Sequence, residues 1–485
     1  MGNSFEGWGK KYGFLLAIIV SLAIWFYPMA GTSITQHKLL AIFGGAIVAW
    51  ITIGVNFAVS CLMTACLLYF WVGNVTGQLK NGVIIRNAEF ALSGYASPTL
   101  WLLLSGFIIC IAMTKTGIAK RLSLHVIGKI GNKPFGAIMA ASLTNYLIAP
   151  VTPSNAARAA AFVPIVEGIA QAYGIKRGES NFGRALAISA AFASNVTASA
   201  FLTGTIANAI AVSVIVGSSG PSTYTSWSYW ALAAAPTNLV LLIVSVWLLL
   251  KIFPPEIKEI PGGITSIDNE LKAMGPISLA EKKAVIFFII AVALWATDQL
   301  HGFNPTMVAL FISVLIYMPY IGVMDWRQAQ NSLPWELFVY VGGVVTLGNA
   351  LSQSKAIEVV IKNLFATAGL TGAPKMVMVI ILMGFTIFSH FWWSTTTSMA
   401  AVMMPIYVGI AMSMGFDVAK FCLPLAMMLS YALFLPFNTV GNVLYFATGY
   451  FSVMDLLKAA IIFSLIAYAG WIVTALTWWR IIGLN

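Results

Sequence analysis

Two short polar stretches interrupt apolar sequence about half a chain apart, and their residue types could bind an anion. The first reads Thr-Pro-Ser-Asn-Ala-Ala-Arg over Thr152–Arg158, and the second reads Ser-Thr-Thr-Thr-Ser over Ser394–Ser398. Their hydroxyl and amide groups can donate hydrogen bonds to a carboxylate, and neither stretch contains Asp or Glu. We therefore expect both stretches to line a site for an anionic substrate.

Each of these stretches is followed by a second one that contains a Thr-x-x-Asn pattern. The pattern begins at Thr205 in the first half and at Thr439 in the second half, 234 positions later. Polar backbone at membrane depth is tolerated only where it lines a cavity or is buried in protein, and corresponding breaks in two halves indicate a transporter's binding site. Around the first stretch, identical residues recur at a spacing of 241: Ala159/Ala400, Ala160/Ala401, Pro164/Pro405, Ile165/Ile406, Gly168/Gly409, Ile169/Ile410, Ala170/Ala411 and Gly174/Gly415.

The candidate binding residues come from all four stretches. Those expected to bind substrate are Ser154, Asn155, Ala156, Thr205, Thr395, Thr396, Thr397, Asn438 and Thr439. Those expected at the breaks of two helices are Thr203, Gly204, Asn208 and Asn442. Half-helix N-termini offer amide donors and partial positive charge, so two matched tips suit a substrate with two anionic ends. The plainer alternative is that these hydroxyls only pair with neighbouring helices, but matched stretches in two repeats favour binding.

The composition is that of an integral membrane protein. Of the 485 residues, 60% are hydrophobic and 8% are charged, and apolar runs of helix-spanning length occur throughout. The formal net charge of +11 is first of all a topology signal, because Lys and Arg are enriched in cytoplasmic loops. The four cysteines and four histidines lie singly, without metal-ligand spacing, so no metal centre is expected.

We predict an all-α integral membrane fold with 11 transmembrane helices in two inverted repeats, each with a re-entrant hairpin and a broken helix. An odd number of spans per half makes the repeats inverted. Each hairpin arm has about 16 residues, or about 24 Å at helical rise, which is short for a full span; two full spans joined by an outer loop are the alternative. The predicted units are an N-terminal helix (1–33), a first repeat (34–252) with hairpin 134–174 and broken helix 185–216, a cytoplasmic linker (253–283), and a second repeat (284–485) with hairpin 374–415 and broken helix 423–447.

The basic residues predict the orientation of the chain in the plasma (inner) membrane. With a cytoplasmic N-terminus, the basic group from Lys115 to Lys133 and the lysines of the linker fall on the cytoplasmic side. Lys355, Lys362 and Lys375 then fall outside, against the rule. Eleven spans place the C-terminus outside.

Two segments carry a resemblance to a known family. One is Ser154-Asn155-Ala156 with Arg158 and Pro164, and the other runs from Leu435 to Tyr450 as LPFNTVGNVLYFATGY. They resemble the divalent anion/sodium symporter family, which includes sodium–dicarboxylate cotransporters and citrate/succinate-type exchangers. The resemblance implies a homodimer in which a transport domain, made of the hairpins and broken helices, moves as an elevator against a scaffold domain. It also implies a candidate sodium site at Ser154, Asn155 and Gly204, with sodium as a coupling ion and no other cofactor.

Several residues depart from the family pattern, in which the hairpin tips read Ser-Asn-Thr and the broken helices carry Thr-Pro-Pro-Asn. Ala156 replaces the Thr of the first tip, and Thr395-Thr396-Thr397 replaces the second tip. The prolines become Ile206-Ala207 and Val440-Gly441. The exchangers of the family carry an arginine that matches Arg158, and we interpret this residue as a charge-compensating group that takes the place of a sodium ion. A snorkelling or scaffold-pairing arginine is the alternative.

The expected function is secondary active transport of C4/C5 dicarboxylates, with citrate as a further candidate, by obligate anion exchange. A sodium-coupled dicarboxylate symporter is the first alternative, and an anion channel or a carrier of inorganic oxyanions is the second. The expected partners are small dicarboxylate anions, the lipid bilayer and a second copy of the chain. An enzyme is not expected, because the sequence shows no HExxH motif, no Asp-rich motif and no Ser/His/Asp set; no nucleic-acid partner is expected either.

Overall fold

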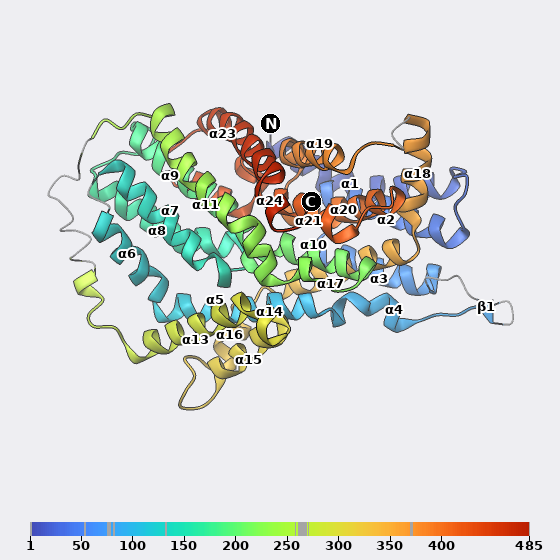
Figure 1. Ribbon diagram of the computed structural model, residues 1–485, viewed down its shortest axis with the longest axis horizontal. Helices are drawn as coiled ribbons and strands as arrows, with labels where there is room; N and C mark the ends of the chain where they lie inside the picture. The colour runs from blue at the N-terminus through green and yellow to red at the C-terminus, as the bar shows by residue number, and fades with distance from the viewer. Residues whose placement is uncertain are drawn as a thin grey trace.

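The computed structural model is a bundle of helices that is elongated along one axis (Figure 1). It describes residues 2–484 except 53–54, 75–78, 81–82, 131–132, 258, 260–268, 270 and 369–371. Within these residues the regular structure is helical apart from a two-stranded antiparallel ladder, β1 (Leu79–Lys80) with β2 (Val83–Ile84). The predicted all-helical class is therefore confirmed, with this short ladder as an addition.

The first half of the chain runs from α1 to α11. Its α-helices are α1 (Gly2–Phe26), α2 (Ile34–Thr52), α3 (Phe57–Leu67), α4 (Ala88–Leu92), α5 (Pro98–Thr116), α6 (Ile118–Ile130), α7 (Pro134–Ile148), α8 (Asn155–Ala172), α9 (Asn181–Ala200), α10 (Ile206–Ser219) and α11 (Trp227–Ile252). Short 3-10 or π segments lie between them: η1 (Leu68–Val72), η2 (Ser93–Ala96), η3 (Ala149–Val151), η4 (Leu202–Gly204) and η5 (Thr223–Thr225). The segments expected as first hairpin and first broken helix correspond to α7–α8 and α9–α10.

The second half runs from α13 to α24. Its α-helices are α13 (Leu279–Ala296), α14 (Asp298–His301), α15 (Pro305–Tyr317), α16 (Trp326–Gln330), α17 (Trp335–Gln353), α18 (Ala356–Ala368), α19 (Lys375–Phe388), α20 (Thr396–Ser413), α21 (Val418–Met428), α22 (Val440–Ala447), α23 (Val453–Leu476) and α24 (Trp478–Ile481). Two 3-10 segments, η6 (Ser389–Trp392) and η7 (Pro436–Asn438), precede α20 and α22. Of the expected linker, 253–283, residues 258, 260–268 and 270 lie outside the described residues, and its last five residues belong to α13.

The break between α21 and α22 is longer than the break between α9 and α10. Five residues, 201–205, separate α9 from α10, whereas eleven residues, 429–439, separate α21 from α22. Leu435 has an extended backbone, with φ −130° and ψ 147°. Because Pro436 follows it, the α conformation of Leu435 is disfavoured, which favours an extended backbone just before η7.

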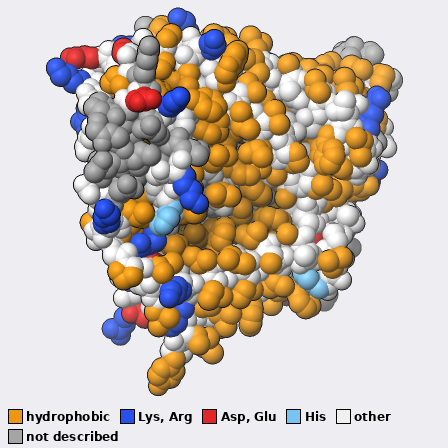
Figure 2. All heavy atoms as spheres, turned by 60° about the vertical axis from the view of Figure 1, so that its left-hand side comes forward, with side chains coloured by type: hydrophobic (Ala, Val, Ile, Leu, Met, Phe, Trp, Pro, Cys, Tyr) orange, Lys and Arg blue, Asp and Glu red, His pale blue; other side chains and the backbone are white. Residues whose placement is uncertain are grey.

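The described chain contains helices suited to a bilayer. Seven helical stretches are long and apolar enough to cross one: Ile34–Thr52, Ala88–Thr116, Pro134–Val151, Trp227–Ile252, Lys375–Trp392, Thr396–Ser413 and Val453–Ile481. Figure 2 shows a broad apolar face, with most of the visible Lys and Arg side chains to one side of it. A chain with these helices and this surface suits a multi-pass membrane protein.

The two halves pack crosswise around the breaks. The second helix of the first pair, α8, packs against α22, and its counterpart α20 packs against α10. Each of these helices therefore contacts the broken helix of the other half. The amphipathic helices α6 and α18 lie toward opposite ends of the long axis (Figure 1).

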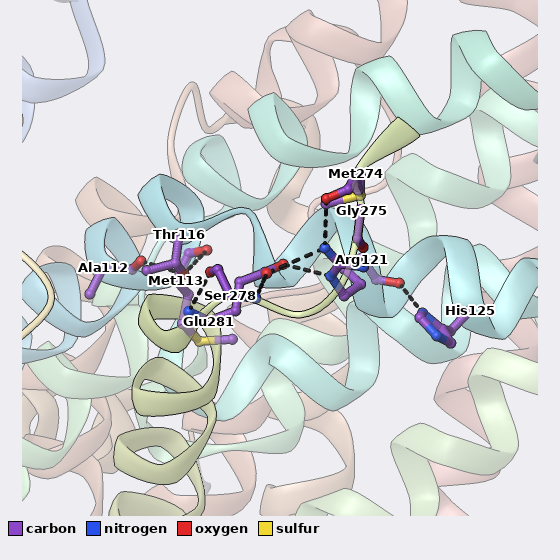
Figure 3. Close-up of polar contacts among 9 residues, drawn as sticks. All are labelled: Ala112, Met113, Thr116, Arg121, His125, Met274, Gly275, Ser278 and Glu281. Carbon is purple, nitrogen blue, oxygen red and sulfur yellow. Dashed lines mark hydrogen bonds and ion pairs between the residues drawn. The ribbon is translucent and has the colours of Figure 1, made fainter. Parts of the chain in front are cut away.

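A buried polar cluster ties α6 to the start of α13 (Figure 3). Arg121 donates from Nε to Glu281 Oε1 at 2.6 Å and from its terminal nitrogens to the carbonyls of Gly275 (2.9 Å) and Met274 (3.2 Å). Glu281 also accepts from the N–H of Ser278 in a capping box at the start of α13. The carboxylate thus caps one helix and pairs with an arginine on another.

A neutral counterpart of this cluster lies at the start of α2, in the first half. Gln36 forms the same reciprocal cap with Ser33 and donates from Nε2 to Ser354 O, just before α18, at 2.7 Å. The turn between α17 and α18 is therefore tied to α2, much as α6 is tied to α13. The tie at α6 is ionic, and the tie at α18 is neutral.

Candidate functional site

The four candidate stretches each contain the N-cap of a helix. Ser154 precedes α8, Thr205 precedes α10, Thr395 precedes α20 and Thr439 precedes α22, all with φ between −159° and −144°. Three of these hydroxyls each accept a hydrogen bond from the backbone N–H three residues later. The donors are Ala157 (3.3 Å), Ser398 (3.0 Å) and Asn442 (3.1 Å). Such a cap uses a lone pair and leaves the hydroxyl proton able to donate, although the Thr395 hydroxyl also lies 2.7 Å from the Ser398 hydroxyl. Hydroxyl protons and N-terminal amides together make donors for an anion.

Contacts near the tips tie the four helix starts to one another. A Cβ atom built on Gly441 would lie 3.0 Å from Asn155 O, so the first turns of α22 and α8 touch. Arg158 on α8 reaches Gly204 O in η4, just before α10. Asn438, one residue before the cap of α22, donates to Trp393 O, two residues before the cap of α20. The region that joins η7 to α22 is therefore adjacent to both tips.

Arg158 is the charged group at this junction, and its side chain is completely buried. Its guanidinium donates to four oxygens: Thr152 O (2.6 Å), Gly204 O (2.6 Å), Asn155 Oδ1 (2.5 Å) and Ser194 O (2.9 Å). All four acceptors are neutral, and among the described residues no carboxylate forms an ion pair with Arg158. A buried cation held only by neutral dipoles leaves a net positive charge, which favours an anion nearby.

Three asparagines form a buried chain from the first tip to the second half. Asn155 donates from Nδ2 to Asn195 Oδ1 at 3.0 Å, and Asn195 donates from Nδ2 to Asn442 Oδ1 at 2.8 Å. Asn442 in turn donates to Ala432 O, within the second break, at 2.8 Å. The chain thus connects α8, α9 and α22.

The two breaks are held by matching amides. Asn208 donates to Ala198 O and Phe201 O, both at 2.8 Å. Asn442 donates to Ala432 O and Leu435 O, which lie 234 positions after those two acceptors. At Gly204 any side chain would clash, because a Cβ there would lie 2.6 Å from Ala198 O. The backbone of the first break is therefore folded tightly back onto α9.

Thr203 links the first break to the first hairpin and to α11. Its hydroxyl donates to Pro150 O at the end of η3 and accepts from Trp227 Nε1 at 2.9 Å. Thr203 therefore holds the first hairpin against the first break, and both of its hydrogen-bonding roles are filled by protein. It is placed to support the site and not to bind a ligand.

The second tip places a neutral amide where the first tip has the guanidinium. Asn438 donates from Nδ2 to Trp393 O and to His390 O, both at 2.8 Å, and accepts the Leu435 N–H at 2.8 Å. Trp393 lies 241 positions after Thr152, which accepts from Arg158. Corresponding carbonyls thus receive donors in both halves, but only the first donor is charged.

The remaining predicted residues lie at the two tips, and those of one tip form no hydrogen bond with those of the other among the described residues. Ala156 and Thr397 are half-buried in the first turns of α8 and α20, and Thr396 is buried. Among the described residues no hydrogen bond joins the first tip directly to Thr395, Thr396 or Thr397. Among the described residues, hydrogen bonds and close contacts of the segment from Asn438 to Asn442 reach both tips.

Several residues of the site did not stand out in the sequence. Ser194 and Asn195 on α9 bind Arg158 and Asn155. They belong to the polar run Ser194-Asn195-Val196-Thr197 within an alanine-rich helix, and that run is the signal that could have identified them.

Comparison with known proteins gives whole-chain matches. The sequence matches the family described as the sodium:sulfate symporter transmembrane region over residues 9–485. A membrane protein of Cupriavidus necator is 28% identical over 483 residues, with 98% of this chain and 93% of the relative covered. The L-tartrate/succinate antiporter of Escherichia coli is 26% identical over 496 residues, with 99% of this chain and 100% of the relative covered.

Two solved transporter structures share the fold. The Alcanivorax borkumensis YdaH transporter superposes with a TM-score of 0.53 at 13% identity, covering 90% of this chain and 98% of its own. Neisseria gonorrhoeae MtrF superposes with a TM-score of 0.52 at 13% identity, covering 88% and 94%. At this identity the likeness concerns the fold alone.

Proposed function

Because the chain belongs to the sodium:sulfate symporter family of membrane transporters, we propose that it is a secondary active transporter that exchanges C4 or C5 dicarboxylates, with citrate as a further candidate. The protein is a multi-pass membrane transporter and not an enzyme. The relative named L-tartrate/succinate antiporter supports a dicarboxylate substrate. The observation that carries the proposal is the buried Arg158 guanidinium, which lies at the first tip without a carboxylate partner among the described residues.

The polar atoms of the first tip favour an anion over a cation. Asn155 Oδ1 and Gly204 O, which a sodium ion would need, already accept hydrogen bonds from Arg158. What remains free is a second N–H of Asn155 Nδ2 and the hydroxyl proton of Ser154. Both groups can donate to a carboxylate, and the Asn155 N–H cannot ligate a cation.

The second tip would bind the other end of the substrate. Thr395 and Thr439 are N-caps there, as Ser154 and Thr205 are in the first half. A ligand with one carboxylate at each tip can use the donors of both halves, whereas a small oxyanion would reach only one. The pairing of tips therefore favours a dicarboxylate over an inorganic oxyanion.

Sodium-independent exchange follows from the same contacts. In a sodium-coupled symporter, unwound carbonyls and half-helix ends coordinate the ion. Here Arg158 occupies the corresponding carbonyls of the first half, and Asn438 donates to those of the second half. We therefore place the protein with exchangers, and a sodium-coupled dicarboxylate symporter becomes the second candidate.

We also propose that the chain crosses the membrane 11 times, forms a homodimer and transports by an elevator motion. The crosswise packing of α8 on α22 and of α20 on α10 supports a compact transport domain built from both halves. The positions of α6 and α18 toward opposite ends of the molecule support inverted repeats (Figure 1). The N-terminus would be cytoplasmic and the C-terminus outside, in the plasma (inner) membrane.

Counterflow in proteoliposomes tests this function. Vesicles loaded with unlabelled succinate and diluted into labelled succinate in sodium-free buffer should accumulate label transiently, and empty vesicles should not. Competition by malate, fumarate, 2-oxoglutarate, citrate and sulfate would rank the substrates. Uptake that requires sodium would overturn exchange, and uptake into empty vesicles that does not saturate would indicate a channel.

A further inference from the structure

Asn195 is a buried amide on α9 that faces the substrate site from behind. Its side chain is fully buried and makes three hydrogen bonds: Oδ1 accepts from Asn155 Nδ2 (3.0 Å), and Nδ2 donates to Asn442 Oδ1 (2.8 Å) and Ala191 O (2.9 Å). It is therefore the one described side chain that hydrogen-bonds to both Asn155 and Asn442.

The surrounding carbonyls determine which way each amide points. Asn442 Nδ2 lies against Ala432 O and Leu435 O, and carbonyls only accept, so Asn442 must turn its oxygen toward Asn195. Asn195 must then present its nitrogen to Asn442, and Ala191 O requires the same orientation. The oxygen of Asn195 is left facing the first tip.

This orientation decides what Asn155 offers to a substrate. Asn195 Oδ1 can only accept, so Asn155 presents its nitrogen there and turns its oxygen to the guanidinium of Arg158, at 2.5 Å. The remaining N–H of Asn155 has no acceptor among the described residues. The tip therefore carries a free donor and no free amide oxygen.

From this chain of amides we infer that Asn195 is a positioning residue for anion binding, which keeps the tip amide of Asn155 in its donating orientation. The inference rests on the proposed function, because it assumes that a carboxylate binds at this tip. It adds a residue that does not touch the substrate but acts on the affinity for it. It also couples the first tip to α22, whose N-cap is Thr439.

The test is Asn195→Asp, which keeps the shape and replaces the N–H donor with an acceptor. The new oxygen would face Asn442 Oδ1 and Ala191 O, both acceptors, so the link to Asn442 is lost and Arg158 alone still orients the tip amide. The KM for succinate counterflow should rise about tenfold, which corresponds to ~1.4 kcal/mol, while kcat changes less than threefold. A purely structural role would lower the amount of active protein and leave KM unchanged.

Asn238 on α11 provides the matched control. It is equally buried, donates from Nδ2 to Ala234 O at 2.9 Å and accepts from Tyr431 at 2.7 Å, but it has no contact with either tip. Asn238→Asp therefore makes the same chemical change outside the site and should leave KM as in the wild type. Asn195→Ser serves as a second variant if Asn195→Asp does not fold, with the same expected rise in KM.

The outcomes separate this inference from the function on which it rests. If the wild type shows no succinate counterflow, the proposed function is overturned and the inference with it. If the wild type exchanges succinate and both Asn195 variants keep its KM, only the positioning role is overturned. The same result follows if Asn238→Asp raises KM as much as Asn195→Asp does.

Discussion

Replacing Arg158 with alanine should turn the first tip into a cation site. The substitution removes the guanidinium but leaves its four acceptors in place: Thr152 O, Gly204 O, Ser194 O and Asn155 Oδ1. Four oxygens that converge on a buried space, with no donor among them, are the type of ligand set that coordinates sodium in transporters with broken helices. We expect the Arg158→Ala protein to bind sodium there.

The magnitude follows from the acceptors that lose their donor. Each unsatisfied buried acceptor costs about 1–3 kcal/mol, so the four together cost roughly 4–12 kcal/mol unless water or an ion replaces the guanidinium. Sodium at a concentration of one hundred times its Kd would stabilise the folded protein by ~2.7 kcal/mol. With an unfolding entropy of about 2.1 cal/mol/K per residue, 485 residues give ~1 kcal/mol/K, so the melting temperature should rise by about 3 °C.

The assay is thermal unfolding of purified protein in sodium chloride and in choline chloride at equal ionic strength. Arg158→Ala should melt about 3 °C higher in sodium, and the wild type should melt at the same temperature in both salts. Arg121→Ala is the control, because it removes another buried arginine whose partners include a carboxylate. An equal sodium effect in Arg121→Ala, or a sodium effect in the wild type, would refute this account of Arg158.

Three further predictions concern the α6–α13 cluster and the helix caps. Arg121→Ala leaves Glu281 buried without its partner and should lower the free energy of unfolding by about 3–5 kcal/mol. The double variant with Arg121→Met and Glu281→Met should lower it less. Thermal melts of the wild type and of these two variants test the difference. The hydrogen bond from Arg121 holds the pKa of Glu281 below its usual range. The ionised carboxylate therefore stabilises the fold fully above about pH 4.3, and this stabilisation is lost as the pH falls further. Glu281→Gln should flatten the acid side of the plot of melting temperature against pH, and an unchanged plot would contradict the pairing. Ser154→Ala and Thr395→Val each remove a cap worth about 1 kcal/mol and a substrate donor, so KM for succinate should rise at least fivefold in either variant, and unchanged uptake kinetics in both would place the substrate elsewhere.

Local residue types made the helix caps and the breaks predictable. Ser and Thr at a helix start accept backbone N–H groups, and the same pattern occurs at Ser154, Thr395 and Thr439. The length of the second break was not predictable from its matched Thr-x-x-Asn pattern, because Leu435-Pro436 extends the chain ahead of it. The prediction of 11 spans depends on membrane insertion and stays a prediction.

The partners of Arg158 lay beyond sequence reasoning for a physical reason. Three of its four acceptors are backbone carbonyls, which every residue carries, so no side-chain pattern marks them. Tertiary packing brings Ser194 O and Gly204 O to the guanidinium from α9 and from η4. The sequence could indicate that a buried arginine needed partners, but only the fold identifies them.

The charge of Arg158 also explains why the proposed carrier would exchange one anion for another. After it releases its substrate, it would not return empty. In an elevator, the site is closed to water while the transport domain crosses. With a dicarboxylate bound, the guanidinium crosses beside a negative charge; without one, it crosses with neutral oxygens alone as partners. Leaving a buried charge unpaired costs about 3–5 kcal/mol. A barrier raised by ~4 kcal/mol slows a step roughly a thousandfold, so the empty carrier would return too slowly to support net uptake, and each crossing would require an anion.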